Sequence, residues 1–505
     1  MLGMLVIGIT SSKKNKNADD YFLGGRNLGG WVAALSAQAS DMSGWLLMGL
    51  PGAVYALGTN QAWIAIGLFI GTVCNWLFIA GRLRRYTIRA GNSMTIPEYL
   101  SNRFGDSKNV LKAISAIVIV VFFLVYTASA FAAGGKLFSS VTSLKYHQAL
   151  TLGAIVILAY TFFGGFIAVC KTDFVQGTLM LVGILAVPIT AVMVMGAGQV
   201  VPNLMESIKA DGLTASATQF LNIFYDGDKP ISVINILSQL AWGLGYCGMP
   251  HILVRFMAIR DEKELGKSKK VAIVWVLLSL VVACIIGVVG RAYLDASVLA
   301  ESSCENVYIE MIKKLFTQDF KLPFIGGILL CGILAAIMST ADSQLLVSSS
   351  SVAKDLFKGV FFKDLSDKTV LLISRIVVLL VAVLAYIIAW NPDSSIMALV
   401  SDAWAGLGSA FGPCILLSLY WKRINLPGAA AGMISGGATV IIWDYVKCMT
   451  LDGVKVTPAT YTGLYSLLVG FAVSLVCIVI VSLITPKVND DILQAFEDVN
   501  SGAVK

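Results

Sequence analysis

Charged residues are scarce in this chain. Asp, Glu, Lys and Arg make up only 13% of its 505 residues, whereas 57% are hydrophobic; a soluble globular protein carries about 25% charged residues. The mean hydropathy is +0.81. These proportions exclude a soluble globular protein and indicate an integral membrane protein with many spans.

Histidine and closely spaced cysteines are scarce as well. The chain has two histidines, and none of its nine cysteines forms a CxxC or Cys/His spacing, which argues against an imidazole or thiolate metal site. We interpret the cysteines as small core residues, although Cys304 and Cys448 fall in loops predicted to lie outside, where a disulfide could join them. No nucleophile–base pair is visible, so we do not expect an enzyme.

The net charge of +7 does not indicate a nucleic-acid partner, because the basic residues fall in short loops between apolar segments. We expect twelve segments to cross a lipid bilayer. They lie near 31–57, 61–81, 112–138, 148–168, 173–197, 231–255, 271–292, 322–353, 369–390, 395–420, 426–446 and 461–485. The apolar stretch 1–10 is too short to span and is expected to be the end of a truncated first helix.

The loops of one side hold 27 of the 37 Lys and Arg residues. The side with the excess of basic residues is the cytoplasmic one. We therefore expect the C-terminus inside and segment 31–57 running from inside to outside.

The stretch Ser36–Trp45, SAQASDMSGW, places the carboxylate of Asp41 near mid-depth of a spanning segment. Intramembrane carboxylates usually mark ion or substrate routes. The small and polar residues of the same turn predict an interruption at Asp41–Gly44, and Pro51-Gly52 predicts a second one. Unwound backbone at this depth is tolerated only where it is packed in protein or lines a cavity.

A second broken helix is predicted five spans later. The stretch Trp242–Pro250, WGLGYCGMP, has three glycines and a proline within nine residues, and both residue types disfavour a helix. Two broken helices that run in opposite directions, five spans apart, are typical of an inverted repeat. The alternative is that these glycines only allow close helix packing.

A third polar cluster, Ala335–Ser351, carries the hydroxyls of Ser339 and Thr340. Together with main-chain carbonyls freed near Ala39–Met42, they would form an oxygen cage for a monovalent cation such as sodium. The alternative is that these hydroxyls bond to carbonyls of their own helix.

Four aromatic residues at similar predicted depth each combine an apolar body with a polar handle. They are Trp45, Tyr126, Trp242 and Tyr246. They would wall an organic substrate, with half-helix N-termini facing a substrate carboxylate; otherwise they are core or interface aromatics.

Five further ionisable residues lie in or near predicted spans. Asp173 is placed at an inner span end, as a solvated flank or as part of an ion exit path. Asp402 has no assigned role. Arg291 and Lys136 are expected to snorkel or to cap helices, and His251 to be structural rather than a proton relay.

Five stretches are similar to motifs of one transporter family. They are DDYFLGGRNLGGW at 19–31, ALSAQASDMSGWLLMGLPGAVY at 34–55, WGLGYCGMPHILVRFMA at 242–258, LAAIMSTADSQLLV at 334–347 and AWAGLGSAFGP at 403–413. In them the chain resembles the sodium/solute symporter family and, within it, the sodium/proline symporters. The resemblance covers residues 19–485.

The resemblance implies an all-α integral membrane protein with a leucine-transporter-like inverted repeat of five plus five spans, flanking helices and about 12–13 spans in total. The implied parts are a truncated first helix and cytoplasmic loop at 1–30, a transport core at 31–420 built from 31–197 and 231–420, two accessory spans at 421–485 and a cytoplasmic tail at 486–505.

The implied activity is secondary active transport by alternating access, in which one sodium ion enters the cell with one L-proline. The implied location is the plasma membrane of a prokaryote, with no obligatory protein partner. The implied sodium site comprises main-chain oxygens of Ala39, Met42 and Ala336 and the hydroxyls of Ser339 and Thr340, with Asp41 essential for sodium directly or on its route. The implied proline contacts are Ser43, Trp45, Gly49, Tyr126, Trp242, Tyr246 and Pro250, and Asp173 resembles a family carboxylate near the inward sodium path.

Other functions stay open at this point. A related symporter of another amino acid, a sugar or a vitamin, coupled to sodium or to protons, has the same general features. A sensor would need an attached signalling domain, for which 486–505 leaves no room, and a channel would conduct independently of substrate.

Overall fold

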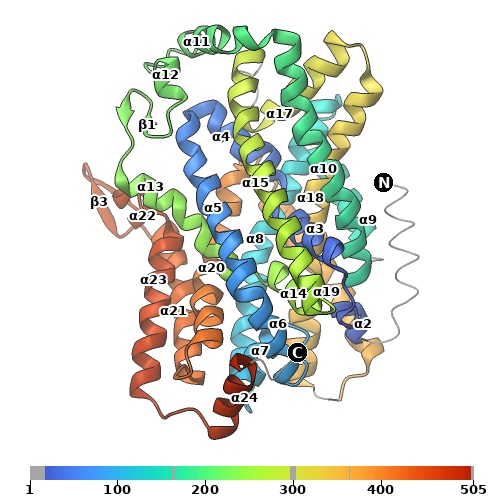
Figure 1. Ribbon diagram of the computed structural model, residues 1–505, viewed down its shortest axis with the longest axis vertical. Helices are drawn as coiled ribbons and strands as arrows, with labels where there is room; N and C mark the ends of the chain where they lie inside the picture. The colour runs from blue at the N-terminus through green and yellow to red at the C-terminus, as the bar shows by residue number, and fades with distance from the viewer. Residues whose placement is uncertain (1–17, 162–164, 296–298, 300–302, 363, 502–505) are drawn as a thin grey trace.

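The computed structural model describes residues 18–161, 165–295, 299, 303–362 and 364–501. These residues form a helical body with two short β-hairpins (Figure 1), β1 (Tyr225–Asp226) with β2 (Lys229–Pro230) and β3 (Met449–Leu451) with β4 (Val454–Val456). The truncated helix predicted at 1–10 lies outside the described residues.

Nine helices of the described chain are long and apolar enough to cross a membrane. They are Thr59–Arg89 (α5 Ala62–Cys74, η4 Asn75–Ile79 and α6 Ala80–Arg89), α8 (Val110–Val141), α10 (Phe166–Met195), α15 (Glu262–Tyr293), Pro323–Phe361 (α18 Pro323–Ser350 and η9 Ser351–Phe361), α19 (Asp367–Ile388), α20 (Ile396–Tyr420), α21 (Leu426–Tyr445) and α23 (Ser466–Ile484). The other three predicted spans correspond to α9 (Tyr146–Thr161) and to the two interrupted segments described below.

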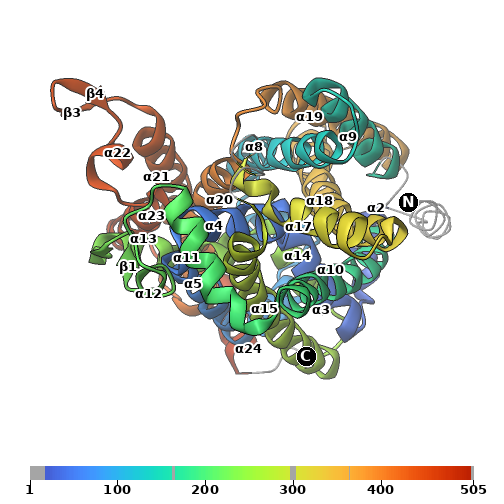
Figure 2. The ribbon, with the colours of Figure 1, turned by 90° about the horizontal axis from the view of Figure 1, so that it is seen from above.

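Shorter helices lie at the two ends of this body. They are α2 (Ala18–Leu23), α7 (Ile96–Arg103), α11 (Val200–Ala210), α12 (Ala217–Phe220), α17 (Val307–Lys313), α22 (Pro458–Thr462) and α24 (Asp490–Asn500). Seen from above, α21 and α23 lie at one side of the body (Figure 2), where both pack against α20. At the opposite end from α11 and α12, α24 packs on α6 (Figure 1).

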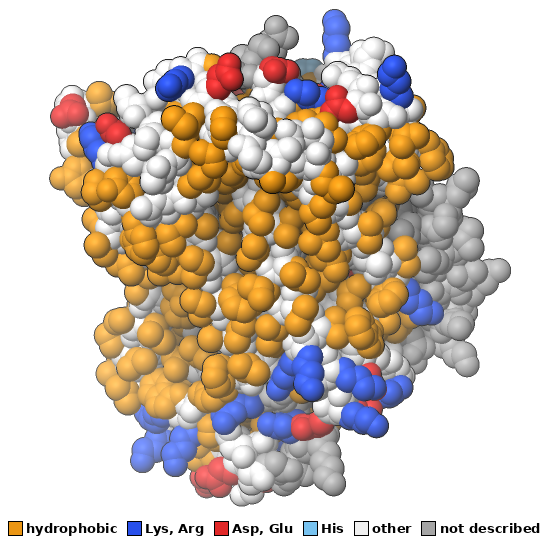
Figure 3. Space-filling view, turned by 45° about the horizontal axis from the view of Figure 1, so that its top comes forward, with side chains coloured by type: hydrophobic (Ala, Val, Ile, Leu, Met, Phe, Trp, Pro, Cys, Tyr) orange, Lys and Arg blue, Asp and Glu red, His pale blue; other side chains and the backbone are white. Residues whose placement is uncertain are grey.

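The surface of the body is apolar around its middle. Figure 3 shows a broad hydrophobic band with Lys and Arg on both sides of it, the larger group lying below the band in this view. Large apolar side chains of this band are more than half exposed, among them Ile117, Val182, Leu380 and Ile480. Exposure of such side chains is unfavourable in water but not in a lipid bilayer. The band therefore fits a lipid-facing surface.

The first predicted break is present. Helix α3 (Gly30–Asp41) ends at Met42, whose φ of −82° and ψ of 74° are not helical, and a π-helix, η2 (Trp45–Gly49), leads into α4 (Leu50–Leu57). The second interruption predicted at Pro51-Gly52 is wrong, because α4 is continuous there. Pro51 lies in the first turn of α4, where its missing N–H disturbs the helix least.

The second predicted break is present as well. Helix α13 (Val233–Leu240) passes into the tighter 3₁₀ helix η6 (Ala241–Gly248), Met249 is extended, and α14 (Pro250–Ala258) begins with proline at its first turn. The glycines also allow close packing: a Cβ atom at Gly71 of α5 would lie 2.2 Å from the carbonyl oxygen of Gly243. Both interpretations of this glycine-rich stretch therefore hold.

Gly71→Ala is expected to destabilise the folded protein, because the added methyl meets main-chain atoms that cannot rotate away. Overpacking of this kind costs about 3 kcal/mol, so the Tm of the purified protein in detergent should fall clearly. Gly266→Ala is the matched control, since a Cβ at Gly266 meets nothing within 4 Å. Equal Tm values for the two variants would contradict the close approach of α5 and η6.

Several predicted positions near span ends need correction. Helix α10 begins at Phe166 rather than at 173, so Asp173 lies inside a helix with none of its side chain exposed and is no solvated flank. Arg291 and Lys136 do not snorkel: each is buried and forms an ion pair, with Asp211 at 2.5 Å and Glu305 at 2.7 Å. The alternative that they cap helices holds for Arg291, whose Nη1 atom donates to the Tyr55 carbonyl oxygen in the last turn of α4 at 2.6 Å.

The disulfide considered between Cys304 and Cys448 is absent, since both are free cysteines. Cys304 lies in a short 3₁₀ helix, Cys304–Asn306, directly before α17. Its main chain lies against α4, because a Cβ atom at Gly52 would be 2.8 Å from the Cys304 carbonyl oxygen. Asp402, in the second turn of α20, accepts a hydrogen bond from the Tyr445 hydroxyl at 2.5 Å.

Candidate ion and substrate site

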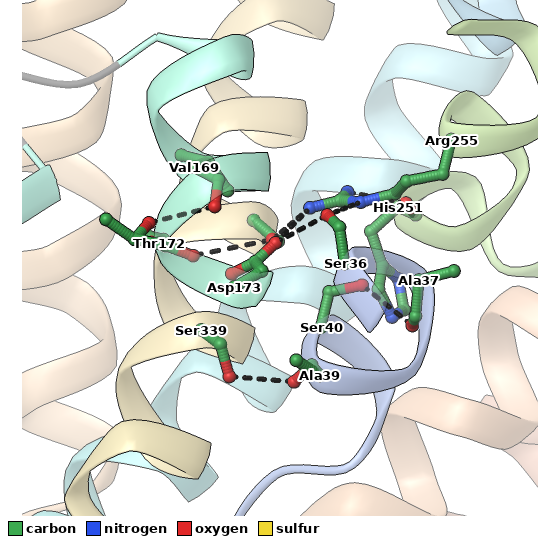
Figure 4. A network of polar contacts seen from close by, with 12 residues as sticks. Ser36, Ala37, Ala39, Ser40, Val169, Thr172, Asp173, His251, Arg255 and Ser339 are labelled. Carbon is green, nitrogen blue, oxygen red and sulfur yellow. Dashed lines mark hydrogen bonds and ion pairs between the residues drawn. The ribbon is translucent and has the colours of Figure 1, made fainter. Parts of the chain in front are cut away.

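The end of α3 meets the middle of α18 through four oxygen atoms. The Ser339 hydroxyl lies 2.7 Å from the carbonyl oxygen of Ala39, and the Thr340 hydroxyl lies 3.4 Å from it. The same hydroxyls lie 3.1 and 3.2 Å from the carbonyl oxygen of Ala336. These four atoms, called the oxygen cluster below, are contributed by residues that are completely buried; Figure 4 shows the contact between Ser339 and Ala39.

Both interpretations of the Ser339 and Thr340 hydroxyls therefore apply, because they contact their own helix and also the broken helix α3. Met42 lies at the break itself and is fully buried, and its amide N–H donates to the Gln38 carbonyl oxygen at 2.8 Å. Because its dihedral angles leave the helix, its own carbonyl oxygen is not committed to the α3 ladder. The participation of Met42 in ion binding stays a prediction.

The chemistry of the oxygen cluster suits a hard cation. In the described residues there is no group of three or more His, Cys, Asp or Glu side chains that could hold a metal ion, so a transition-metal site is not indicated there. Carbonyl and hydroxyl oxygens beside an unwound helix are the ligands that transporters use for sodium.

Asp41, the last residue of α3, carries a charge with little compensation. Its side chain is completely buried, and its Oδ2 atom accepts a hydrogen bond from the Tyr246 hydroxyl at 2.6 Å. Its Oδ1 atom has no hydrogen-bond partner, and within the described chain Asp41 forms no ion pair. A buried carboxylate in this state is costly, so a cation at this position would stabilise it.

The four predicted aromatic residues gather around Asp41. The Trp45 indole N–H donates to the Asp41 carbonyl oxygen at 3.0 Å, and the Tyr126 hydroxyl lies 3.5 Å from the same oxygen. The Trp242 ring lies 6.5 Å from the Trp45 ring, centroid to centroid. All four are nearly completely buried. That they share one substrate site stays a prediction.

The remaining predicted substrate residues lie at the edges of this group. Ser43 is buried within the break, with its Oγ atom 3.4 Å from the Trp45 amide nitrogen. Gly49 lies one turn after Trp45, where a Cβ would be 3.4 Å from the Met397 sulfur. Pro250 begins α14 and lines a small cavity of about 20 Å³ whose lining includes none of the four aromatic residues.

Two aromatic residues at this site were not expected from the sequence. Trp404 of α20 donates its indole N–H to the Trp242 carbonyl oxygen at 2.8 Å, and the Tyr465 ring stacks on the Trp242 ring at 5.3 Å. Trp404 lies within one of the family-like motifs, which could have revealed it. Tyr465 follows a loop and carries no such signal.

Arg255, the last residue of the predicted span 231–255, has no role assigned from the sequence, and the structure buries it. Its side chain is 1% exposed and its guanidinium lies 3.2 Å from Asp173 (Figure 4). His251, one turn earlier, is fully buried against the rings of Phe123 and Tyr126. A structural role for His251 is consistent with this packing.

The apolar multi-pass body thus contains two broken helices, a cluster of oxygen atoms and a buried carboxylate. This combination is typical of an ion-coupled secondary transporter. Residues 21–436 match the profile of the Sodium:solute symporter family, and the chain belongs to that family. Its members are transporters, so the prediction that the chain is not an enzyme is confirmed.

Full-length relatives are 42–45% identical to this chain. They include the high-affinity proline transporter PutP of Bacillus subtilis (strain 168), 45% identical over 98% of each chain, and the osmoregulated proline transporter OpuE of the same organism, 45% identical over 96% of this chain and 93% of the relative. A sodium/proline symporter of Haemophilus influenzae is 44% identical over 98% of this chain and 95% of the relative.

Two solved structures share the fold. A Na⁺-coupled sialic acid symporter in a substrate-bound outward-open state superposes with a TM-score of 0.74 at 18% identity, covering 97% of each chain. A nucleobase-cation-symport-1 family transporter superposes with a TM-score of 0.53 at 13% identity, covering 96% of this chain and 99% of that one. The predicted leucine-transporter-like fold is confirmed.

Proposed function

We propose that this protein carries L-proline into the cell together with sodium, by alternating access. The observation that carries the proposal is the oxygen cluster of Ala39, Ala336, Ser339 and Thr340 at the end of α3. The buried carboxylate of Asp41, whose Oδ1 atom has no hydrogen-bond partner, belongs to the same helix end. Full-length relatives named as proline transporters support proline as the solute.

Proline is a small zwitterion with an apolar ring, and the site offers partners for each part. The buried Asp41 carboxylate would attract the substrate ammonium group or the sodium ion beside it. The helix N-termini at Trp45 and Pro250 would favour the substrate carboxylate. The rings of Trp45, Trp242 and Tyr126 would contact the pyrrolidine ring.

The break in α3 explains how the two solutes are coupled. Sodium would hold the unwound end of α3 against α18 through Ala39, and the same break carries Asp41, Ser43 and Trp45 toward the substrate. Binding of one solute then prepares the site for the other, and the coupling is reciprocal. Sodium and proline must together favour one conformational state for transport to be coupled.

The proposed domain organisation follows the family pattern. Two inverted repeats, 31–197 and 231–420, form the transport core; 1–30 is a leading segment, 421–485 adds two accessory spans and 486–505 is a cytoplasmic tail. The end rich in Lys and Arg (Figure 3) faces the cytoplasm, as the positive-inside rule requires. The membrane is the plasma membrane of a prokaryote.

The proposal is tested by uptake of labelled proline into proteoliposomes that contain the purified protein. An inward sodium gradient should raise the initial rate of proline uptake at least about tenfold over an equal potassium gradient. A tenfold effect corresponds to a coupling free energy of only about 1.4 kcal/mol. A panel of unlabelled amino acids, a sugar and a vitamin should compete less well than proline. Uptake driven equally well by a proton gradient, or sodium conduction that ignores proline, would contradict the proposal.

A further inference from the structure

Tyr465 connects the accessory part of the chain to the candidate substrate site. It directly precedes α23 as the N-cap residue of that helix and lies outside the proposed transport core at 31–420. Its ring stacks on the Trp242 ring, with a centroid distance of 5.3 Å and an interplanar angle of 22°. Trp242 is one of the predicted proline contacts, so a residue of the accessory segment packs directly against a predicted wall of the substrate site.

Hydrogen bonds fix Tyr465 at both of its ends. Its amide N–H donates to the Ser238 hydroxyl of α13 at 3.1 Å, and that hydroxyl donates to the Gly463 carbonyl oxygen at 3.3 Å. The Tyr465 hydroxyl donates to the Ser401 carbonyl oxygen of α20 at 2.8 Å. The start of α23 and the broken helix that contains α13 therefore lie side by side (Figures 1 and 2), and the Tyr465 ring is held between them and α20.

The Trp242 ring is part of a group of aromatic rings that joins the two broken helices. The Trp45 ring of the first broken helix lies 6.5 Å from it, at an interplanar angle of 37°. The Trp404 ring of α20 also lies 6.5 Å from it, at 27°, and its indole N–H donates to the Trp242 carbonyl oxygen. Trp404 thus fixes the main chain of Trp242, whereas the stacked Tyr465 ring fixes its side chain.

The position of the Trp242 ring decides how much room lies beside it. Trp242 belongs to the 3₁₀ helix η6 and is followed by Gly243, which has no side chain that could restrain the indole. A stacked ring covers part of the indole surface and resists its rotation, so a substrate can meet only the remaining surface. Without the Tyr465 ring, the indole could move into the vacated space, and the substrate site would widen.

We propose that Tyr465 is a positioning residue that fixes the Trp242 ring and thereby limits the ring size of the imino acid that the protein accepts. This inference rests on the proposed function, since it requires that Trp242 contacts proline. Tyr465 acts through Trp242 and does not contact the substrate. The accessory segment at 421–485 then takes part in substrate selection.

The test compares ring homologues of proline as competitors of labelled proline uptake under an inward sodium gradient. L-azetidine-2-carboxylate has a ring one carbon smaller than that of proline, and L-pipecolate has a ring one methylene larger. A methylene in a well-shaped apolar pocket changes discrimination by about 10- to 200-fold. In Tyr465→Ala the inhibition constant of L-pipecolate, divided by that of proline, should therefore fall at least about fivefold, while the ratio for L-azetidine-2-carboxylate should not fall.

Two further variants at the same position separate the ring from the hydroxyl. Tyr465→Phe keeps the stacked ring and loses only the hydrogen bond to Ser401, so the L-pipecolate ratio should stay within about twofold of wild type. Tyr465→Leu fills most of the volume without a flat ring and should lower the ratio in the same direction as Tyr465→Ala. It decides the question if Tyr465→Ala fails to fold.

Tyr461→Ala is the matched control, because Tyr461 lies in the neighbouring helix α22 with 48% of its surface exposed. It should leave the L-pipecolate ratio within about twofold of wild type. A ratio of inhibition constants does not depend on the amount of active protein, so a residue needed only for folding would lower uptake and leave the ratio unchanged.

An unchanged ratio in Tyr465→Leu and in the folded Tyr465→Ala variant would overturn the inference while leaving the proposed function intact. A ratio in Tyr465→Phe as low as that in Tyr465→Leu would overturn it as well, because the stacked ring would then not be the cause. Failure of the wild-type protein to take up proline with sodium would instead overturn the proposed function.

Discussion

Asp41→Asn is expected to abolish sodium-driven proline uptake. Asparagine keeps the size of the side chain but removes the negative charge, which has no cationic partner in the described chain and accepts a hydrogen bond only from Tyr246. Loss of one partner of a buried charged contact costs about 3 kcal/mol or more, which corresponds to a decrease of at least about 100-fold. Initial uptake rates in proteoliposomes, normalised to the amount of inserted protein, measure this effect.

The loss of uptake expected for Asp41→Asn depends on the buried position of this carboxylate. Asp402→Asn is the control, because it removes a carboxylate at a less buried position. Asp402 also lies in a predicted span, but it is partly exposed and its carboxylate accepts one hydrogen bond from Tyr445 near the end of α20. Its replacement should change uptake by less than about twofold, as for most substitutions away from buried networks. If Asp41→Asn retained sodium-driven uptake near the wild-type rate, the proposed site would be wrong.

Removing the hydroxyls of Ser339 and Thr340 is expected to have the next largest effect. Each hydroxyl lies within 3.4 Å of the Ala39 carbonyl oxygen, so each alanine variant removes one oxygen from the cluster. Changes in the immediate surroundings of a metal ion cost about 10- to 100-fold in affinity. The sodium concentration for half-maximal uptake should rise by that factor in each single variant and further in the double variant.

The proline dependence gives a second measurement on these variants. At saturating sodium, the KM for proline should return close to the wild-type value in Thr340→Ala, because the lost oxygen contacts sodium rather than proline. Thr340→Ser keeps a hydroxyl and should preserve the sodium dependence. Ser349→Ala is the control on the same helix, since the Ser349 hydroxyl bonds only to the Leu346 carbonyl oxygen of α18. A rise in sodium requirement for Ser349→Ala equal to that for Ser339→Ala would contradict a localised sodium site.

The helix breaks were predictable because they depend on local composition. Glycine, proline and small polar residues disfavour helix wherever they occur, and at Met42 and Met249 the backbone does leave the helix. The same rule failed at Pro51, because a proline in the first turn of a helix costs little, and the π-helix before α4 creates such a first turn. Local composition does not reveal where that turn begins.

The charged residues were harder to interpret. Asp173, Arg255, Arg291 and Lys136 lie near the ends of apolar stretches, where a solvated or snorkelling side chain is the usual outcome. Each is buried instead, because its partner comes from a distant part of the chain: Arg255 pairs with Asp173, 82 residues away, and Lys136 with Glu305, 169 residues away. Hydropathy describes one segment at a time and contains no information about such partners.

By itself, the sequence of this protein determined the membrane environment, the two broken helices, the oxygen-bearing residues of α3 and α18 and the family. These properties depend on the composition and spacing of neighbouring residues, which are set along the chain. Only the tertiary structure decided that Ser339 faces Ala39, 300 residues away, that Tyr246 reaches Asp41, and that Arg255 rather than water neutralises Asp173. These contacts depend on the relative rotation and depth of packed helices, which follow from the shape of the whole core.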